Sequence, residues 1–204
     1  MLDWIREQWN RSVSRAAENA LRETLNAQLS EQDWGQATRT LEHLQRLCPE
    51  DRELQLVGVK LDRRLGRLEH GVPQLLRLLG EHPELASEVL RFVEAFREQQ
   101  APEGARELLE QSVRRLPENL DLRFRWAWWL YEEGEVQEAA GELQWVLSRQ
   151  PDHLEAHLGL GFCQVLLGDK QEAMLQVEQV QRLDSARAGE LLSAIYENPE
   201  HFHA

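Results

Sequence analysis

Apolar residues recur every three or four positions along most of the chain, which is the spacing of amphipathic helices. One such run passes through Leu122, Trp126 and Leu130, and the next passes through Val136 and Leu143. No segment shows the strict alternation of apolar and polar residues that is typical of a half-buried strand. The pattern therefore predicts an all-α chain in which consecutive helices fold back on each other as hairpins.

The same pattern returns with a period of 34 residues. The period is marked by four prolines, Pro49, Pro83, Pro117 and Pro151. At another phase a small residue is followed four positions later by a large one; these pairs are Ala37 and Leu41, Gly71 and Leu75, Ala105 and Leu109, Ala139 and Leu143, and Ala173 and Val177. A small residue lets two helices approach closely, and a proline cannot continue a helix. The period predicts five helical hairpins in series.

The turn inside each hairpin carries a weaker signal. Gly66, Gly134 and Gly168 stand where two helices must reverse direction, but Gln32 and Gln100 occupy the corresponding places in the other two hairpins. Glycine is favoured there because a helix commonly ends in the left-handed conformation.

Two segments carry a family resemblance. The first has Trp126-Ala127, Gly134, Ala139-Ala140, Leu143 and Pro151, and the second has Leu160-Gly161, Gly168-Asp169, Ala173 and Val177. Both segments resemble the tetratricopeptide repeat family, and the first three hairpins are more degenerate versions. The resemblance implies a right-handed α-solenoid of antiparallel helix hairpins, with repeats at 18–51, 52–85, 86–119, 120–153 and 154–187.

The second repeat departs from the family pattern. Gly58 and Asp62 stand where the family usually has large residues, and Pro73 closely follows Gly71. Because proline is unfavourable inside a helix, we expect the second helix of this repeat to start late.

Both ends of the chain carry helical patterns outside the repeats. At the N-terminus, one face is formed by Leu2, Ile5, Trp9, Val13 and Ala16. Residues 1–17 are therefore expected either as a separate amphipathic capping helix or as the start of one long first helix. Residues 188–204 are expected as a C-terminal capping helix and tail, with Ser185 as the N-cap. Such end helices cover the apolar face of a terminal repeat.

The resemblance implies a concave groove, lined by the first helix of each repeat, that binds an extended peptide or a partner helix. Projected onto that groove, the N-terminal half is basic and contributes Arg22, Asn26, Lys60, Arg63, Arg64, Arg91 and Arg97. The C-terminal half is aromatic and contributes Phe124, Arg125, Trp128, Tyr131 and Phe162. Arg, Trp and Tyr are frequent anchors of binding energy, so the two halves favour an acidic partner that contains aromatic residues.

Two alternatives concern the basic half. Arg63, Arg64 and Arg97 could equally be solvated or pair with nearby glutamates. Some family members grip a C-terminal carboxylate with basic and amide side chains, and here only part of that set matches. Lys60 and Ser87 depart from it.

Charge narrows the classes of partner. The formal net charge is −13 and the isoelectric point is about 5.0, which opposes binding to nucleic acid or to anionic membranes. A membrane partner is unlikely on a second ground, because no run of about 18 apolar residues occurs. Cys48 and Cys163 are far apart in sequence, so we expect reduced thiols in a cytoplasmic protein.

Motifs for catalysis or cofactors are missing from the sequence. His153 and His157 have helical spacing but no convincing third metal ligand. Gly159 and Gly161 lack the third glycine of a dinucleotide site and are interpreted as close-packing residues. We expect no enzyme activity, no metal and no cofactor.

These observations predict an adaptor or chaperone-like scaffold that binds a peptide or helix of a client protein. The alternative is a self-assembling scaffold, a homo-oligomer in which the N-terminal helix or the tail 196–204 docks on a neighbouring copy.

Overall fold

The computed structural model describes residues 2–197, with side chains from residue 15 onward. It contains eleven α-helices, α1 (Leu2–Ser30), α2 (Trp34–Leu47), α3 (Arg52–Arg64), α4 (Leu68–Leu79), α5 (Ala86–Glu98), α6 (Pro102–Arg115), α7 (Leu120–Glu132), α8 (Val136–Arg149), α9 (Leu154–Leu166), α10 (Lys170–Leu183) and α11 (Ser185–Glu197), and a 3₁₀ helix η1 (Pro83–Leu85). The described residues contain no strand, so the all-α solenoid is confirmed.

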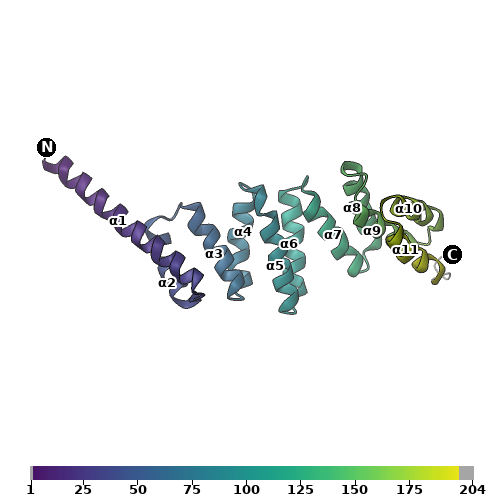
Figure 1. The fold of residues 1–204 in the computed structure, drawn as a ribbon, viewed down its shortest axis with the longest axis horizontal. Coiled ribbons are helices and arrows are strands. Elements are labelled where there is room, and N and C mark those ends of the chain that lie inside the picture. Colours follow the sequence, from purple (N-terminus) through teal and green to yellow (C-terminus); the bar gives the residue numbers. More distant parts are fainter. Residues whose placement is uncertain (1, 198–204) are drawn as a thin grey trace.

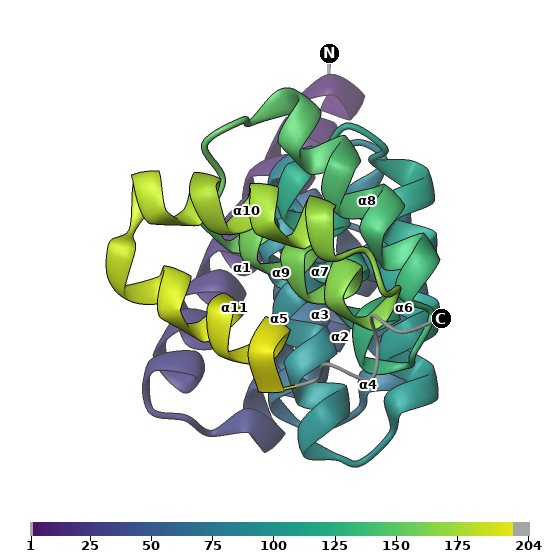
Figure 2. The same ribbon diagram turned by 90° about the vertical axis from the view of Figure 1, so that its right-hand side faces the viewer.

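The helices stack in series from one end of an elongated molecule to the other (Figure 1). Seen along the array, α10 and α11 lie in front of the earlier helices (Figure 2). Successive helices alternate between two roles. The first helices α3, α5, α7 and α9 begin 34 residues apart, and so do the second helices α2, α4, α6, α8 and α10. We call the surfaces formed by these two sets, with α1 among the first helices, the first-helix face and the second-helix face.

Side chains fix where the first helices begin. Asp51, Asn119 and His153 each accept a hydrogen bond from the backbone N–H three residues later, which satisfies a donor that the helix leaves unpaired. Helix α5 has no such cap and is preceded instead by η1. The unit starts thus follow the proline period through a recurring local contact.

The small residues of the 34-residue pattern lie at the contact between helices. Ala37, Ala105, Ala139 and Ala173 have no exposed surface. In the fifth case, a Cβ added to Gly71 would lie 2.9 Å from the ring of Phe92, so even alanine would be crowded there. These positions set how closely each hairpin can close.

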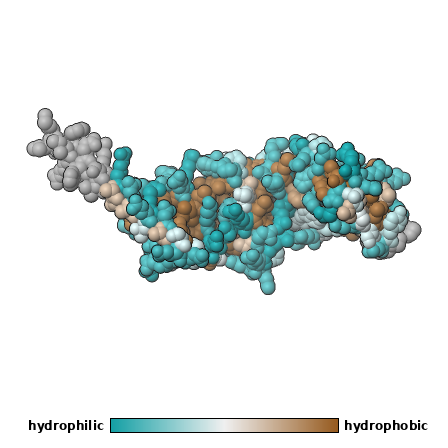
Figure 3. Space-filling view, in the orientation of Figure 1, coloured by the Kyte–Doolittle hydropathy of each residue, from teal (hydrophilic) through white to brown (hydrophobic). Residues whose placement is uncertain are grey.

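The apolar core is divided along the array into four clusters of buried residues. The cluster of the first hairpin includes Leu25, Leu41 and Leu44 and extends to Leu54 and Leu61 of α3. Strips of hydrophobic residues appear between hydrophilic ones along the face shown in Figure 3. The first hairpin is therefore joined to the array mainly through α3.

The turns of all five hairpins share one backbone conformation. Gly66, Gly134 and Gly168 have positive φ, and Gln32 and Gln100 also adopt it, with φ of 60° and 57°. The backbone geometry thus recurs where the glycine signal does not, at the cost of left-handed strain in the two glutamines.

Two local expectations were wrong. Helix α4 does not start late: it begins at Leu68 and continues through Pro73. The first turn is already formed there, because the N–H groups of His70 and Gly71 both bond to the carbonyl of Arg67. The N-cap of α11 is not Ser185.

That cap is Asp184, whose carboxylate accepts hydrogen bonds from the N–H groups of Ala186 and Arg187. Its side chain lies one residue before the helix, where an acceptor can reach the free amides.

The ends of the array extend past the repeats. Residues 2–30 form one continuous helix, twice as long as α2, and it projects beyond α2 (Figure 1). The predicted apolar face at residues 2–13 and the tail from residue 198 lie outside the side chains that the structure describes. Within the described part of the chain, no helix has the length and apolar composition required to cross a bilayer.

We expect Gln100→Gly to raise the free energy of unfolding by about 0.5–1 kcal/mol, because glycine removes the strain of positive φ. The matched control is Gly134→Gln, at the same turn position with open space around it, which should lower stability by about 1 kcal/mol. Urea unfolding followed by circular dichroism measures both. Equal effects of the two changes would contradict this account of the turn.

Candidate functional site

All twelve residues predicted to line the groove belong to first helices, and none is fully buried. Arg22 and Asn26 lie on α1, and the other basic residues lie on α3 and α5. Phe124, Arg125, Trp128 and Tyr131 lie on α7, and Phe162 lies on α9. The structure brings some of these residues together and separates others.

A hollow of about 340 Å³ opens between α5 and α7 on the first-helix face. Leu90 and Phe124 supply its apolar walls, and its polar lining consists of Glu94, Asp121 and Arg125. Arg125 forms an ion pair with Glu94 across the two helices. This hollow can accept an apolar side chain next to hydrogen-bonding groups.

Beside the hollow lies a row of aromatic side chains on α7. The rings of Phe124 and Trp128 are 6.3 Å apart, and those of Trp128 and Tyr131 are 5.5 Å apart, both edge to face. The ring of His153 extends the row, 4.8 Å from Phe124. We call these four residues the aromatic row. Each of its side chains keeps part of its surface exposed.

Glycine lets the aromatic row lie against α9. A Cβ added to Gly159 would lie 3.1 Å from Leu143 and 3.6 Å from the indole of Trp128. At Gly161 the added Cβ would lie 2.4 Å from Leu191. The interpretation of both glycines as close-packing residues is thereby confirmed. Phe162 does not extend the row and packs instead against the C-terminal core cluster.

The basic half of the predicted groove is largely neutralised by carboxylates. Glu88, whose side chain is 2% exposed, receives hydrogen bonds from Arg63 at 2.7 Å and from Arg91 at 3.0 Å. Arg97 pairs with Glu132 and also lies over the ring of Trp129.

Arg64 and Lys60 differ, since they form no ion pair with any described residue. Arg64 lies 5.8 Å from the centre of the Trp34 ring.

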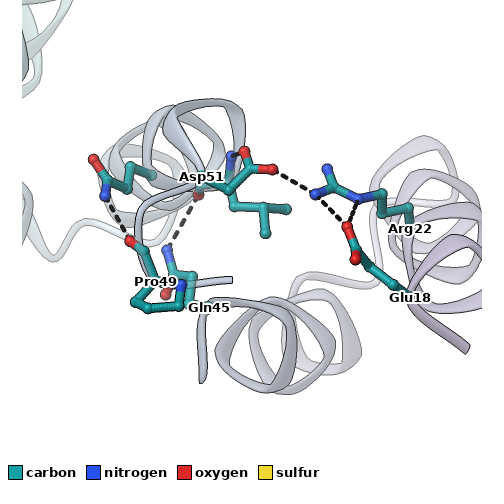
Figure 4. Close-up of polar contacts among 7 residues, drawn as sticks. Glu18, Arg22, Gln45, Pro49 and Asp51 are labelled. Atoms are coloured by element: carbon teal, nitrogen blue, oxygen red, sulfur yellow. Dashed lines mark hydrogen bonds and ion pairs between the residues drawn. The ribbon is translucent and has the colours of Figure 1, made fainter. Parts of the chain in front are cut away.

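Arg22 joins α1 to the start of α3 (Figure 4). Its guanidinium donates to Glu18 at 2.9 Å and to Asp51 at 2.5 Å, and Asp51 also caps α3. The bonds from Asp51 and Glu18 raise the pKa of Arg22 above its ordinary value. For Asp51, burial acts to raise the pKa, but the bonds from Arg22 and the Leu54 N–H leave that pKa lowered. Arg22 thus has an intramolecular carboxylate partner.

The histidines and cysteines have structural surroundings. His157 is buried, and its ring nitrogens contact Gln176 at 2.7 Å and the carbonyl of Pro151 at 2.8 Å. Burial raises the pKa of Cys163 to about 12, so its thiol is a poor nucleophile at neutral pH. In the part of the chain that the structure describes, no three His, Cys, Asp or Glu side chains could share a metal ion.

Sequence reasoning missed two hollows on the second-helix face. One, of about 550 Å³, lies between α2 and α4, and the other, of about 570 Å³, lies between α4 and α6. Gly58 and Asp62, the residues that depart from the repeat pattern, line the first hollow. Their small or polar side chains were the available signal, because a missing large residue leaves space between repeats.

Comparison with known proteins matches this architecture. Two family models, each described as a tetratricopeptide repeat, match residues 130–195 and 90–144. No curated protein matches the chain.

Several solved structures share the fold. A crystal structure of MamA protein is 14% identical with a TM-score of 0.58, covering 84% of this chain and 94% of its own. A second MamA structure, AMB-1 in P212121, is 21% identical with a TM-score of 0.58, covering 87% and 97%. YrrB, described as "a TPR protein with an unusual peptide-binding site", is 19% identical with a TM-score of 0.59, covering 80% and 85%.

We expect Arg63→Met to lower the free energy of unfolding by about 2 kcal/mol, because it removes a partner of the buried Glu88 carboxylate. Arg91→Met should cost less than about 1 kcal/mol, since the Arg91 side chain is 59% exposed. Chemical denaturation of both variants measures the difference. The Arg63 assignment fails if the two losses are equal, or if adding Glu88→Gln does not recover part of the loss.

Proposed function

Because the chain belongs to the tetratricopeptide repeat superfamily, a group of protein-interaction scaffolds, we propose that it is an adaptor that holds a peptide or helix of a client protein on its first-helix face. Members of this superfamily are typically not enzymes, and the proposed role requires no reaction. The observation that carries the proposal is the partly exposed aromatic row beside the hollow between α5 and α7.

Exposed aromatic rings in contact suit a binding surface. Each pair of rings in edge-to-face contact holds its partner in place, so little side-chain entropy remains to be lost on binding. Trp and Tyr also combine a large apolar area with a polar group that can bond to a peptide backbone. Trp128, in the middle of the row, is therefore the expected anchor for a client.

The hollow beside the row suggests how the client is oriented. An apolar client side chain can enter between Leu90 and Phe124, while Arg125, Glu94 and Asp121 can bond to the client backbone. Peptide binding by YrrB, a neighbour in fold, supports this mode as one that such a solenoid can perform.

The arginines contribute less to the proposed client chemistry. An acidic group of a client would compete with Glu88 for Arg91, or with Glu94 for Arg125. We therefore propose a client anchored by apolar or aromatic residues, with acidic residues as a secondary feature. A chaperone-like role and a cytoplasmic location are part of the proposal, and the free thiols of Cys48 and Cys163 are consistent with that location.

The alternative, self-assembly through the N-terminal helix or the tail, stays a prediction, because the side chains that it needs lie outside those described.

Trp128→Ala should weaken client binding about tenfold to a hundredfold, the usual range for a central aromatic anchor. The matched control is Trp145→Ala on α8, which removes a partly exposed tryptophan that lies between Arg123 and Arg149. Partners captured from native extract by the intact protein identify the client, and calorimetry with the purified client compares the variants. Circular dichroism must show that both variants are folded.

A client that binds Trp128→Ala and the intact protein equally would place its site elsewhere. An equal loss with Trp145→Ala would indicate general destabilisation and not a groove contact.

A further inference from the structure

The two hollows on the second-helix face meet at the N-terminal half of α4. Glu69 and Phe96 line both of them. We call the combined depression the α4 trough; its residues used below are Glu42, Glu69, Val72, Phe96, Glu103 and Glu107. It lies on the helices that do not carry the aromatic row, so it is separate from the proposed client site.

The trough has an apolar floor made accessible by small residues. Gly104 places the backbone of α6 directly against Phe96, where an added Cβ would lie 2.5 Å from the ring. Val72 is partly exposed, and Pro73 lies beside it on the lining. At Gly58 an added Cβ would lie 3.0 Å from the amide of Gln45, so any larger side chain would enter the first hollow.

The carboxylates around this floor are not neutralised. The side chains of Glu42, Glu69 and Glu103 have no hydrogen bond or ion pair with any described residue, and Glu107 accepts a bond from Gln111 alone. This contrasts with the first-helix face, where five predicted arginines each pair with a carboxylate.

The cations near the trough do not offset these charges. Arg67 is held by Asp62 at 2.7 Å, and Arg115 bonds within its own helix to Gln111. Pro73 also has no N–H, so the carbonyl of Glu69 cannot accept its usual helical bond and remains a further acceptor. The trough thus combines an apolar floor with several acceptors and no free donor of matching charge among the described residues.

We propose that the α4 trough binds a basic segment of a partner protein in which lysine or arginine side chains flank an apolar anchor residue. The anchor packs on Val72 and the Phe96 ring. The flanking cations meet Glu69 and Glu103, which occupy the same position in consecutive repeats, 34 residues apart. Association is steered by the net charge of −13, and it weakens as salt rises.

The test uses a fluorescein-labelled peptide that alternates arginine and leucine, followed by fluorescence anisotropy with the full chain. Two comparison probes carry glutamate in place of arginine, or arginine without leucine. The arginine–leucine peptide should bind, and each comparison probe should bind at least roughly tenfold more weakly because it lacks either the charge or the anchor.

The variant pair Glu69→Gln/Glu103→Gln should lower the affinity of the arginine–leucine peptide by roughly threefold to tenfold. The matched control, Glu138→Gln/Glu172→Gln, removes the same charge from α8 and α10 and should leave the affinity unchanged. Trp128→Ala should also bind the probe normally, which separates this proposal from the client site.

Three results would overturn the proposal: no binding of the arginine–leucine peptide, equal binding of the probe that lacks leucine, or equal losses in the two glutamine pairs.

Discussion

Each hairpin of the array closes on one small residue in its second helix. Four of these positions are alanines without exposed surface, and the fifth is Gly71, which has no room for a side chain beside Phe92. A larger group there would separate the two helices, and the leucines packed beside it would lose their contacts. Because repeats stack directly on one another, such a shift would also move α7 against α9 and disturb the aromatic row.

The two faces of the solenoid differ in how their charges are balanced. On the first-helix face, arginines pair with carboxylates across repeats, as in Arg63 with Glu88 and Arg125 with Glu94. That arrangement leaves aromatic and apolar surface as the main means of binding there. On the second-helix face, Glu69 and Glu103 stay unpaired beside apolar floor. The same scaffold can therefore offer two surfaces of different chemistry.

Much of the fold could be predicted from the sequence, because one period fixes it. The spacing of proline and small residues gave the hairpins, and the helical pattern gave their faces. The pairing of Arg63 and Arg91 with Glu88 could not be derived, since it depends on how consecutive helices align. Pro73 misled because a proline early in a helix removes one hydrogen bond without preventing the first turn. The trough is formed by absent side chains, which leave little trace in a pattern of large residues.

The ion pairs between repeats also mean that the repeats are not interchangeable. Arg125 in the fourth repeat meets Glu94 in the third, and the residue that corresponds to Glu94 in the second repeat is Lys60. If the second repeat were placed directly before the fourth, Lys60 would face Arg125 and two like charges would meet. The order of the repeats is thus written into their charges, and shuffling them would produce a chain of the same composition that stacks less well.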